Sequence, residues 1–197
     1  MGPSLTGNKD EVEKAAGIPL TIVLPALFAE SALGMGLLEV DRVGNRLAIP
    51  GDGDNQPLFV CTREYIAAAY ASIFAATPVA RLQSRVLGLT EVQVTGKELA
   101  KALEAKNGAP PKIFYHSLEE VDKNIETALA QGRPLALAWL CRKFWGAGMF
   151  PEAIGSDIWE VPGYKKKTIE ELIVEDQLVS YRDAPPEVHA ALEKTFY

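Results

Sequence analysis

The sequence has little basic charge and no long apolar run. Its 20 Lys and Arg are outnumbered by 26 Asp and Glu, which gives a net charge of -6, and its longest basic run is Lys165–Lys167. No nucleic-acid partner is expected, because binding to phosphates needs concentrated positive charge. The uncharged stretches 18–29 and 65–80 contain proline and fall short of the roughly 20 apolar residues that span a bilayer, so no membrane association is expected. The first residues also lack the basic and apolar regions of a secretory signal, which favours a cytoplasmic protein.

Cysteine and histidine are scarce, and their spacing does not match the usual sites built from them. Cys61 and Cys141 lie outside any C-x-x-C pair and are expected to be reduced, buried thiols. His116 and His189 have no Cys or carboxylate at the spacing of a catalytic triad or a zinc site. No metal is therefore expected.

Phosphate-binding and dehydrogenase motifs are missing as well. Residues 51–56, GDGDNQ, begin like the G-x-G-x-x-G fingerprint but lack its third glycine and carry two carboxylates that repel phosphate. A turn is the simpler interpretation. In the segment Tyr164–Thr168, threonine stands where a Tyr-x-x-x-Lys pair needs lysine.

The hydrophobic pattern predicts alternating strands and helices. Leu20–Leu24 is a continuous β-branched run, typical of a strand covered on both faces in a parallel sheet. Thr62, Thr95 and Ser117 are expected helix N-caps. The predicted helices are 8–17, 28–38, 63–76, 97–106, 118–130, 135–145, 169–175 and 186–196, and the predicted strands are 20–24, 46–49, 58–60, 85–89 and 112–115. Helix 63–76 is expected to be packed on several sides and the last two helices to be peripheral, while strands 46–49 and 58–60 form either a hairpin or two pieces of sheet joined by a loop.

The order of several short motifs carries a resemblance. Residues 9–28, KDEVEKAAGIPLTIVLPALF, read as a helix, a "gIP-T" strand and a Pro-x-x-Phe loop, and residues 49–55 read as a "GdGn" turn. Residues 59–67 read as the start of a "DIA" helix, 86–106 as a strand and an "N-E-L" helix, and 163–172 as a "Y-T-eE-l" helix. In this order the segments resemble the NmrA-like and isoflavone-reductase-like NAD(P)-binding proteins over nearly the whole chain.

The resemblance implies an α/β fold. It comprises the C-terminal portion of an NAD(P)-binding Rossmann-like fold, with a few of its strands, and a smaller α+β substrate-binding region. Residues 1–197 are then one NmrA-like domain without the Gly-rich, nucleotide-binding N-terminal half, and strand 20–24 has lost the neighbours that cover one edge. The implied cofactor is NADP or NAD, although no phosphate-binding turn for it is recognisable.

The resemblance also implies a catalytic residue. Catalytic members of the family use a lysine in the helix before the "gIP-T" strand as the general acid/base of hydride transfer. Lys9 is the candidate here, although it lies about one helical turn closer to the strand than the family position, where Thr6 stands. The alternative for Lys9 is a solvated residue of a charged helix.

Binding residues follow from the same resemblance. The loop after the strand faces the nicotinamide and substrate in the family, and ligands of open α/β sheets bind at such carboxyl ends. Its residues here are Pro25, Ala26, Leu27 and Phe28. A wall of an apolar substrate pocket is expected from Phe28, Trp139, Phe144 and Trp145. The alternative for both sets is ordinary packing within the core.

Three functional interpretations stay open from the sequence. The first is an NAD(P)H-dependent oxidoreductase acting on a small aromatic or polyketide-like substrate, represented by its C-terminal part. The second is a non-catalytic NmrA-type regulator that binds dinucleotide and a protein partner. The third is an inactive remnant or dimerising module whose exposed sheet edge is covered by another chain. The partners expected are a small-molecule substrate and either a second copy or the missing N-terminal half.

Overall fold

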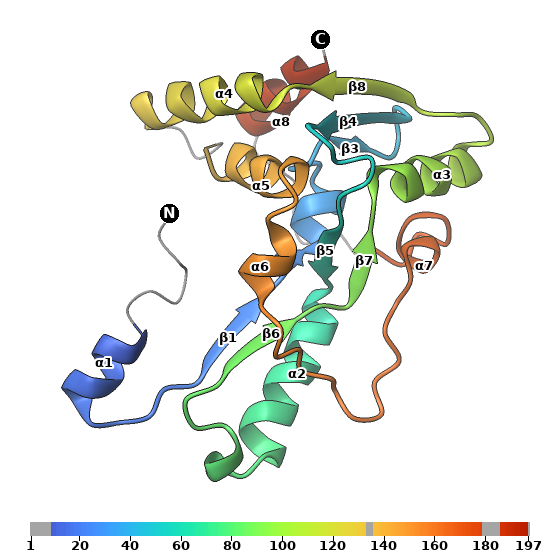
Figure 1. The fold of residues 1–197 in the computed structure, drawn as a ribbon. Helices are drawn as coiled ribbons and strands as arrows, with labels where there is room; N and C mark the ends of the chain where they lie inside the picture. Colours follow the sequence, from blue (N-terminus) through green and yellow to red (C-terminus); the bar gives the residue numbers. More distant parts are fainter. Residues whose placement is uncertain (1–8, 133–135, 179–185, 197) are drawn as a thin grey trace.

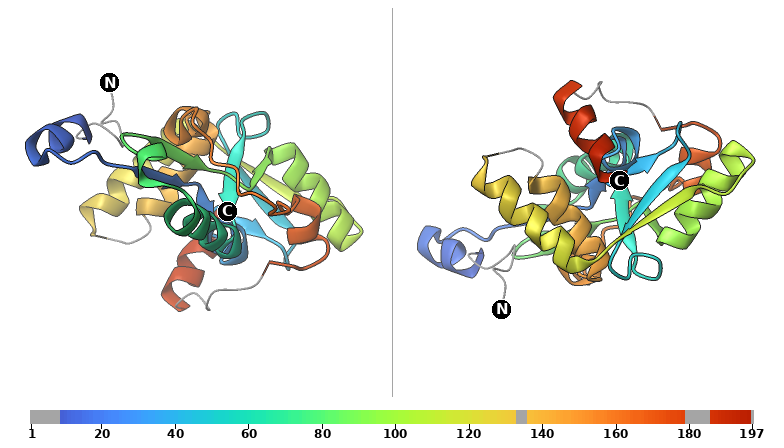
Figure 2. Two further views of the ribbon diagram at one scale, coloured as in Figure 1. Left: turned by 90° about the horizontal axis from the view of Figure 1, so that it is seen from below. Right: turned by 90° about the horizontal axis from the view of Figure 1, so that it is seen from above.

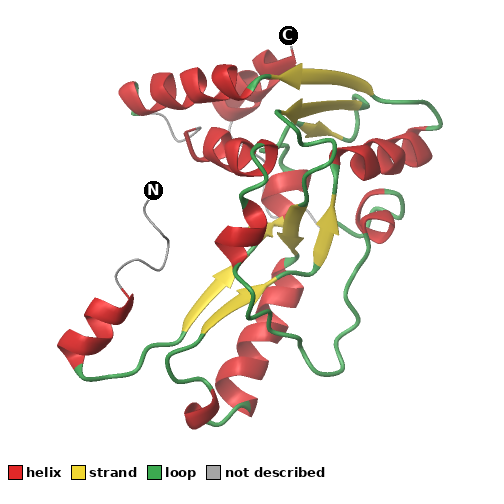
Figure 3. Cartoon of the chain, viewed as in Figure 1, coloured by secondary structure: helices red, strands yellow, loops and turns green. Residues whose placement is uncertain are grey.

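The structure, a computed structural model, describes residues 9–132, 136–178 and 186–196. Strands and helices are mixed up to residue 116, and the described elements after it are all helices (Figure 1, Figure 3). The strands are β1 (Ile22–Pro25), β2 (Leu27–Phe28), β3 (Val40–Asp41), β4 (Arg46–Pro50), β5 (Leu58–Cys61), β6 (Val86–Leu89), β7 (Val92–Val94) and β8 (Lys112–His116). The helices are α1 (Lys9–Ala16), the π-helix η1 (Glu30–Gly34), α2 (Arg63–Ala76), η2 (Val79–Arg81), α3 (Gly96–Asn107), α4 (Leu118–Ala130), α5 (Ala136–Gly146), α6 (Phe150–Ile154), α7 (Ile169–Ile173), α8 (Pro186–Glu193) and η3 (Lys194–Phe196). The described strands form three small sheets, ordered β1-β6, β2-β5-β7 and β3-β4-β8.

The predicted strand 20–24 is β1, and it pairs in parallel with β6, with Ile22 opposite Val86 and Leu24 opposite Gly88. On the far side of β6, Gly88 forms a bridge to Ile158. No described strand pairs with the other edge of β1. All of β1 is only partly buried, so the prediction that both its faces are covered is wrong for the described chain.

The two strands around the 51–55 turn do not form a hairpin. β4 pairs with β3 and β8, whereas β5 pairs with β2 and β7. The segment between them is therefore a loop joining two sheets, which was the second of the two predictions. Its conformation is fixed by packing against α5, because the Asp52 N–H donates to the Gly146 carbonyl at 3.0 Å.

Helix N-termini lie where the capping residues predict them. Thr62 accepts a hydrogen bond from the Tyr65 N–H, and Thr95 and Ser117 each begin a capping box. Thr168, which was not predicted as a cap, begins a third capping box. Helix α2 ends at Ala76, shortly before Pro78. These agreements follow because a cap is a local interaction that depends on residues three positions apart.

Three helices differ from the expectation, two in their burial and one in its length. Helix α7, expected to be peripheral, buries Ile169, Leu172 and Ile173 in the main core. Helix α2, expected to be packed on several sides, buries a single face and leaves Phe74 exposed. The predicted helix 28–38 is reduced to the short π-helix η1.

The two thiols agree with expectation. Cys61 is buried and Cys141 partly buried, and neither forms a disulfide.

Candidate functional site

The segment Pro25–Phe28, predicted to be a loop, consists of the last residue of β1, then Ala26, then the two-residue strand β2. This strand-end loop lies beside the ends of β6 and β5. The Ala26 N–H donates to the Leu89 carbonyl of β6 at 3.0 Å, and Leu27 lies opposite Val60 in the parallel pair β2–β5. Ala26 is buried, and its small side chain suits this close approach of two backbones. The ring of Phe28 is 43% exposed. The loop is therefore fixed by its backbone while it presents an aromatic side chain at its surface.

Glu30 ties this loop to the start of helix α2. Its carboxylate is 6% exposed, and its Oε1 accepts the Arg63 N–H at 2.9 Å. Its Oε2 is buried and accepts no hydrogen bond from the described residues. Glu30 is also the first residue of η1, and π-helical turns are frequent at functional sites.

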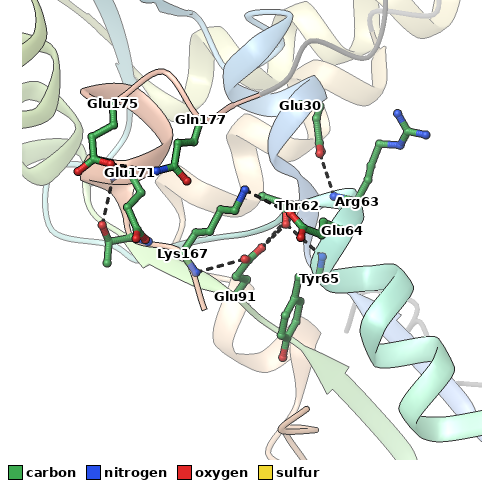
Figure 4. A network of polar contacts seen from close by, with 11 residues as sticks. Glu30, Thr62, Arg63, Glu64, Tyr65, Glu91, Lys167, Glu171, Glu175 and Gln177 are labelled. Atoms are coloured by element: carbon green, nitrogen blue, oxygen red, sulfur yellow. Dashed lines mark hydrogen bonds and ion pairs between the residues drawn. The ribbon is translucent and has the colours of Figure 1, made fainter. Parts of the chain in front are cut away.

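Glu91 holds the same helix end together with the segment before α7. Its Oε2 accepts both the N–H and the hydroxyl of Thr62, each at 2.7 Å, and its Oε1 accepts the Lys167 N–H at 3.2 Å. Figure 4 shows Glu30 above the first turn of α2 and Glu91 below it. Both carboxylates are stabilised there by the N–H groups and the dipole of the helix.

The neutral groups around this helix end are held in their protonated forms. Burial raises the pKa of the Cys61 thiol to about 12, and burial and the charge of Glu91 raise that of Tyr164. The Cys61 Sγ contacts the Leu89 carbonyl at 3.3 Å. A thiol with a raised pKa is a poor nucleophile, so the site offers acceptor oxygens and rigid backbone rather than covalent chemistry.

Lys9 is not brought to this loop. Its helix α1 lies beyond the amino end of β1, whereas Pro25 lies at the carboxyl end (Figure 1). Both views of Figure 2 show α1 set apart from the rest of the molecule. Glu13 connects the helix to the strand by accepting the Leu20 N–H at 2.6 Å. The side chain of Lys9 itself lies outside the described residues.

The aromatic residues predicted for a substrate pocket point into different surroundings. Trp145 is fully buried in the main core, and its Nε1 donates to the Gln56 carbonyl at 3.1 Å. Trp139 belongs to a separate cluster with α4. Phe144 packs against the main core, with its ring 6.0 Å from that of Phe150. Trp145 is thus a core residue, and the three rings of α5 belong to two different packing clusters of the described residues.

A surface cavity of about 200 Å³ lies elsewhere, between η1, β3 and the C-terminal helices. Its lining includes Met35, Val40, Arg42, Leu192 and Phe196. None of the four predicted pocket aromatics lines it.

A second buried polar cluster lies beneath α5 and was not predicted. Glu39 and Arg142 form an ion pair at 2.5 Å with both side chains almost completely buried, and Arg142 also donates to the Leu37 carbonyl. The guanidinium lies 4.1 Å from the centre of the Trp139 ring, and His116 Nε2 lies 3.7 Å from Glu39. Burial lowers the pKa of Arg142 to about 10, although Glu39 acts in the opposite direction. Arg142 is therefore still charged at neutral pH.

Glu30, Glu91, Glu39 and Arg142 are the buried charged residues that the sequence analysis missed. One signal was available: Glu30 is the only charged residue in the segment 18–38. A lone carboxylate in an apolar segment must find donors when the segment is buried.

Four helix N-termini of the described chain are unfavourable for a phosphate, because each has a carboxylate beside it. Helices α2, α3, α4 and α7 each have a side-chain carboxylate at their first N–H groups, supplied by Glu30, Glu98, Glu120 and Glu171. A phosphate would have to displace a negative charge at each of these positions.

Within the described ranges there is no group of three His, Cys, Asp or Glu that could hold a metal ion. No helix in the part of the chain that the structure describes is both long and apolar enough to cross a membrane.

No protein-family model and no curated protein matches this sequence. Solved structures do match. Isoflavone reductase superposes with a TM-score of 0.67 at 20% identity, over 85% of this chain and 55% of that one. Leucoanthocyanidin reductase from Vitis vinifera, in a binary complex with NADPH, superposes with a TM-score of 0.63 at 16% identity, over 84% and 55% of the two chains. AtPrR2 with NADP+ and (+)pinoresinol gives a TM-score of 0.59 at 19% identity, over 86% and 55%.

These likenesses establish the fold. The α/β, partial Rossmann-like architecture that the sequence motifs predict is confirmed, and it is shared with the isoflavone-reductase-like proteins. The chain spans about half the length of the solved structures it matches.

Proposed function

We propose that this chain forms the substrate-facing part of an NAD(P)H-dependent reductase of the isoflavone-reductase-like type. The substrate class proposed is a small aromatic or polyketide-like organic compound. The proposal is supported by the shared fold, since structures with that fold hold NADPH or NADP+ and, in one complex, (+)pinoresinol. The observation that carries it within this chain is the rigid loop Pro25–Phe28 at the carboxyl end of a parallel strand pair, the usual ligand position in open α/β sheets.

The residues present fit the nicotinamide end of the cofactor and do not fit its pyrophosphate. The backbone of Pro25–Phe28 and the exposed ring of Phe28 would hold the nicotinamide end. The four carboxylate-filled helix N-termini do not fit the pyrophosphate. We therefore assign the phosphate contacts to a nucleotide-binding segment outside the described residues. When bound, NAD(P)H supplies the hydride.

The roles of the remaining residues follow from this placement. Phe28 would lie against both nicotinamide and substrate, and Trp139 and Phe144 would support the substrate wall from α5. Trp145 would stabilise that helix from within the core. Lys9 is proposed as the general acid/base, which requires α1 to approach the loop in the assembled enzyme.

Reduced nicotinamide mononucleotide and adenosine 2′,5′-bisphosphate, which represent the two halves of NADPH, test this division. Saturation-transfer NMR on the purified chain should detect the mononucleotide, and Phe28→Ala should abolish its signal. Phe74→Ala, at another exposed ring, should leave the signal unchanged. No signal should appear for the bisphosphate. Tight binding of the bisphosphate, or a mononucleotide signal indifferent to Phe28→Ala, would contradict the proposal.

The catalytic assignment has its own test. In the enzyme assembled with that nucleotide-binding segment, and with NADPH and a panel of aryl carbonyl compounds, Lys9→Ala should lower turnover by roughly 10²-fold, the usual contribution of a general acid/base. Lys14→Ala changes the same charge on the same helix and should have no effect. Equal effects of the two substitutions would remove Lys9 from the mechanism.

The separation of α1 from the loop favours a second candidate function. In that case the chain is part of a non-catalytic, NmrA-type dinucleotide-sensing regulator, or an inactive remnant acting as a binding or dimerising module. Binding of the mononucleotide without any turnover across the panel would favour this candidate.

A further inference from the structure

Helix α2 has an apolar face that no described part of the chain covers. Its inner face buries Tyr65, Ile66, Ala69 and Ile73. The opposite face exposes Ala67, Tyr70, Ala71, Phe74 and Ala75. Phe74 is 63% exposed, which is unusual for an aromatic ring in the middle of a hydrophobic helix face.

The two exposed rings are already arranged as one surface. The rings of Tyr70 and Phe74 stack with centres 5.5 Å apart and planes at 22°. They lie one helical turn apart, and Ala67 and Ala71 occupy the adjoining positions. The face therefore has two projecting rings next to two hollows formed by small side chains.

We propose that this face binds the same face of a second copy of the chain, with the two α2 helices antiparallel about a two-fold axis near Tyr70 and Ala71. In that arrangement Phe74 of each copy packs on Ala67 of the other, and Tyr70 packs on Ala71. A two-fold interface requires such self-complementarity, because one surface must supply both the projections and the hollows. Small residues also let two helix backbones approach closely.

Charge at the two ends of the helix agrees with this arrangement. Arg63 and Glu64 lie in the first turn of α2, and its last turn contains no basic residue. An antiparallel partner brings Arg63 to the C-terminal end of the other α2, where a cation is favoured by the helix dipole. Glu64 already pairs with Lys167 of its own chain, with Lys167 Nζ 3.3 Å from Glu64 Oε2, so the first turn brings no unpaired carboxylate to the interface. The central part of the face has no charge, so the net charge of -6 does not oppose contact there.

A second copy accounts for this face better than an unrelated partner does, because one two-fold axis places a large ring opposite a small side chain in both pairs, Phe74 opposite Ala67 and Tyr70 opposite Ala71. The inference does not depend on the reductase proposal, since α2 could pair in this way in a chain that binds no cofactor.

Sedimentation equilibrium of the purified chain tests the interface. The expected mass is twice 21.4 kDa at tens of micromolar. Phe74→Glu should raise the dimer dissociation constant at least about 10-fold, as expected for a central aromatic contact. Val43→Glu, at a site that is 94% exposed and far from α2 in sequence, should leave it unchanged. Circular dichroism of both variants should match the parent chain, because neither residue is buried. A monomer at 100 micromolar, or equal effects of the two substitutions, would overturn the proposal.

Disulfide trapping provides a second readout that does not depend on affinity alone. Ala71→Cys lies next to the proposed axis and should form a covalent dimer under mild oxidation. Ala105→Cys, exposed on α3, is the matched control and should remain mostly monomeric. Cross-linking of Ala105→Cys as fast as Ala71→Cys would show random collision and contradict the antiparallel arrangement.

Discussion

Glu91 accepts both the backbone N–H and the hydroxyl of Thr62 at 2.7 Å, from a position in the turn between β6 and β7. The carboxylate is 7% exposed, and the chain segment before α7 reaches it through the Lys167 N–H. One side chain thus joins three segments that lie far apart in sequence. Since the loop Pro25–Phe28 is tied to the same helix end through Glu30, the geometry of the candidate site depends on this carboxylate.

Replacing Glu91 by alanine should destabilise the fold substantially. The substitution leaves the buried N–H of Thr62 without its acceptor, and we expect a loss of about 2–4 kcal/mol in the free energy of unfolding. Urea denaturation measures it. Glu98→Ala is a close control, because Glu98 accepts the N–H and hydroxyl of Thr95 with the same geometry but in an exposed capping box. Glu98→Ala should lower the free energy of unfolding by about 0.5–1 kcal/mol. Equal costs would show that the burial of Glu91 adds nothing.

Local features of this region could be predicted from the sequence and long-range ones could not. Thr62 was identified as the cap of α2 because the capping interaction involves only nearby residues. Glu91 and Glu30 bind the same helix end from 29 and 33 residues away, and no sequence spacing indicates such pairs. The strand 20–24 was predicted from its apolar run, whereas β7, with three residues, was too short to recognise.

The surroundings of Trp139 could not be read from the sequence either. Its neighbours in sequence predict a place in a pocket wall, and in the structure its ring packs against Arg142 and α4. Glu39 and Arg142 are more than a hundred positions apart in the chain, so their pairing is a property of the fold. The motif order still predicted the fold class correctly, because it records the succession of elements rather than their contacts.

Removing one partner of the pair Glu39–Arg142 should lower the free energy of unfolding strongly, whereas replacing both partners by apolar residues should lower it little. Arg142→Met leaves a buried carboxylate without its main partner, and we expect a loss of about 3–5 kcal/mol. The double variant Glu39→Leu with Arg142→Met removes both charges and should recover most of it. Lys166→Met, which breaks an ion pair of exposed Glu160 at 2.9 Å, should change stability by less than about 1 kcal/mol. Thermal and urea unfolding of the four proteins give the comparison, and a double variant as unstable as Arg142→Met would contradict it.

The contact between α5 and the 51–55 turn should tolerate no side chain at Gly146. A Cβ there would lie 2.6 Å from the Pro50 carbonyl oxygen, which belongs to backbone that cannot move freely. Gly146→Ala should therefore cost about 1–3 kcal/mol. Gly34→Ala is the control, because the nearest atom to its Cβ would be in the side chain of Leu178 at 3.6 Å, an ordinary contact distance, and it should be close to neutral. If Gly146→Ala proves as stable as the parent, the close packing of α5 on this turn is wrong.

The thiols should be unreactive until the protein unfolds. Burial raises the pKa of Cys61 to about 12 from an ordinary value of 9.0, so at pH 8 the thiolate fraction falls by roughly 10³-fold. The same cause raises the pKa of Cys141. Reaction with a chromogenic disulfide should be slow for the native protein and complete in urea.

The same shift has a consequence for stability at alkaline pH. Between pH 9 and 12 the unfolded chain loses the Cys61 proton while the folded chain keeps it, so the free energy of unfolding should fall as the pH rises through this range. Below pH 9 both states are protonated and the contribution is complete. Urea titrations at pH 8, 9.5 and 10.5 measure the slope, and Cys61→Ala should reduce it because the titrating group is gone. A slope unaffected by Cys61→Ala would assign the alkaline loss to other groups, of which buried Tyr65, with its raised pKa, is the first to test.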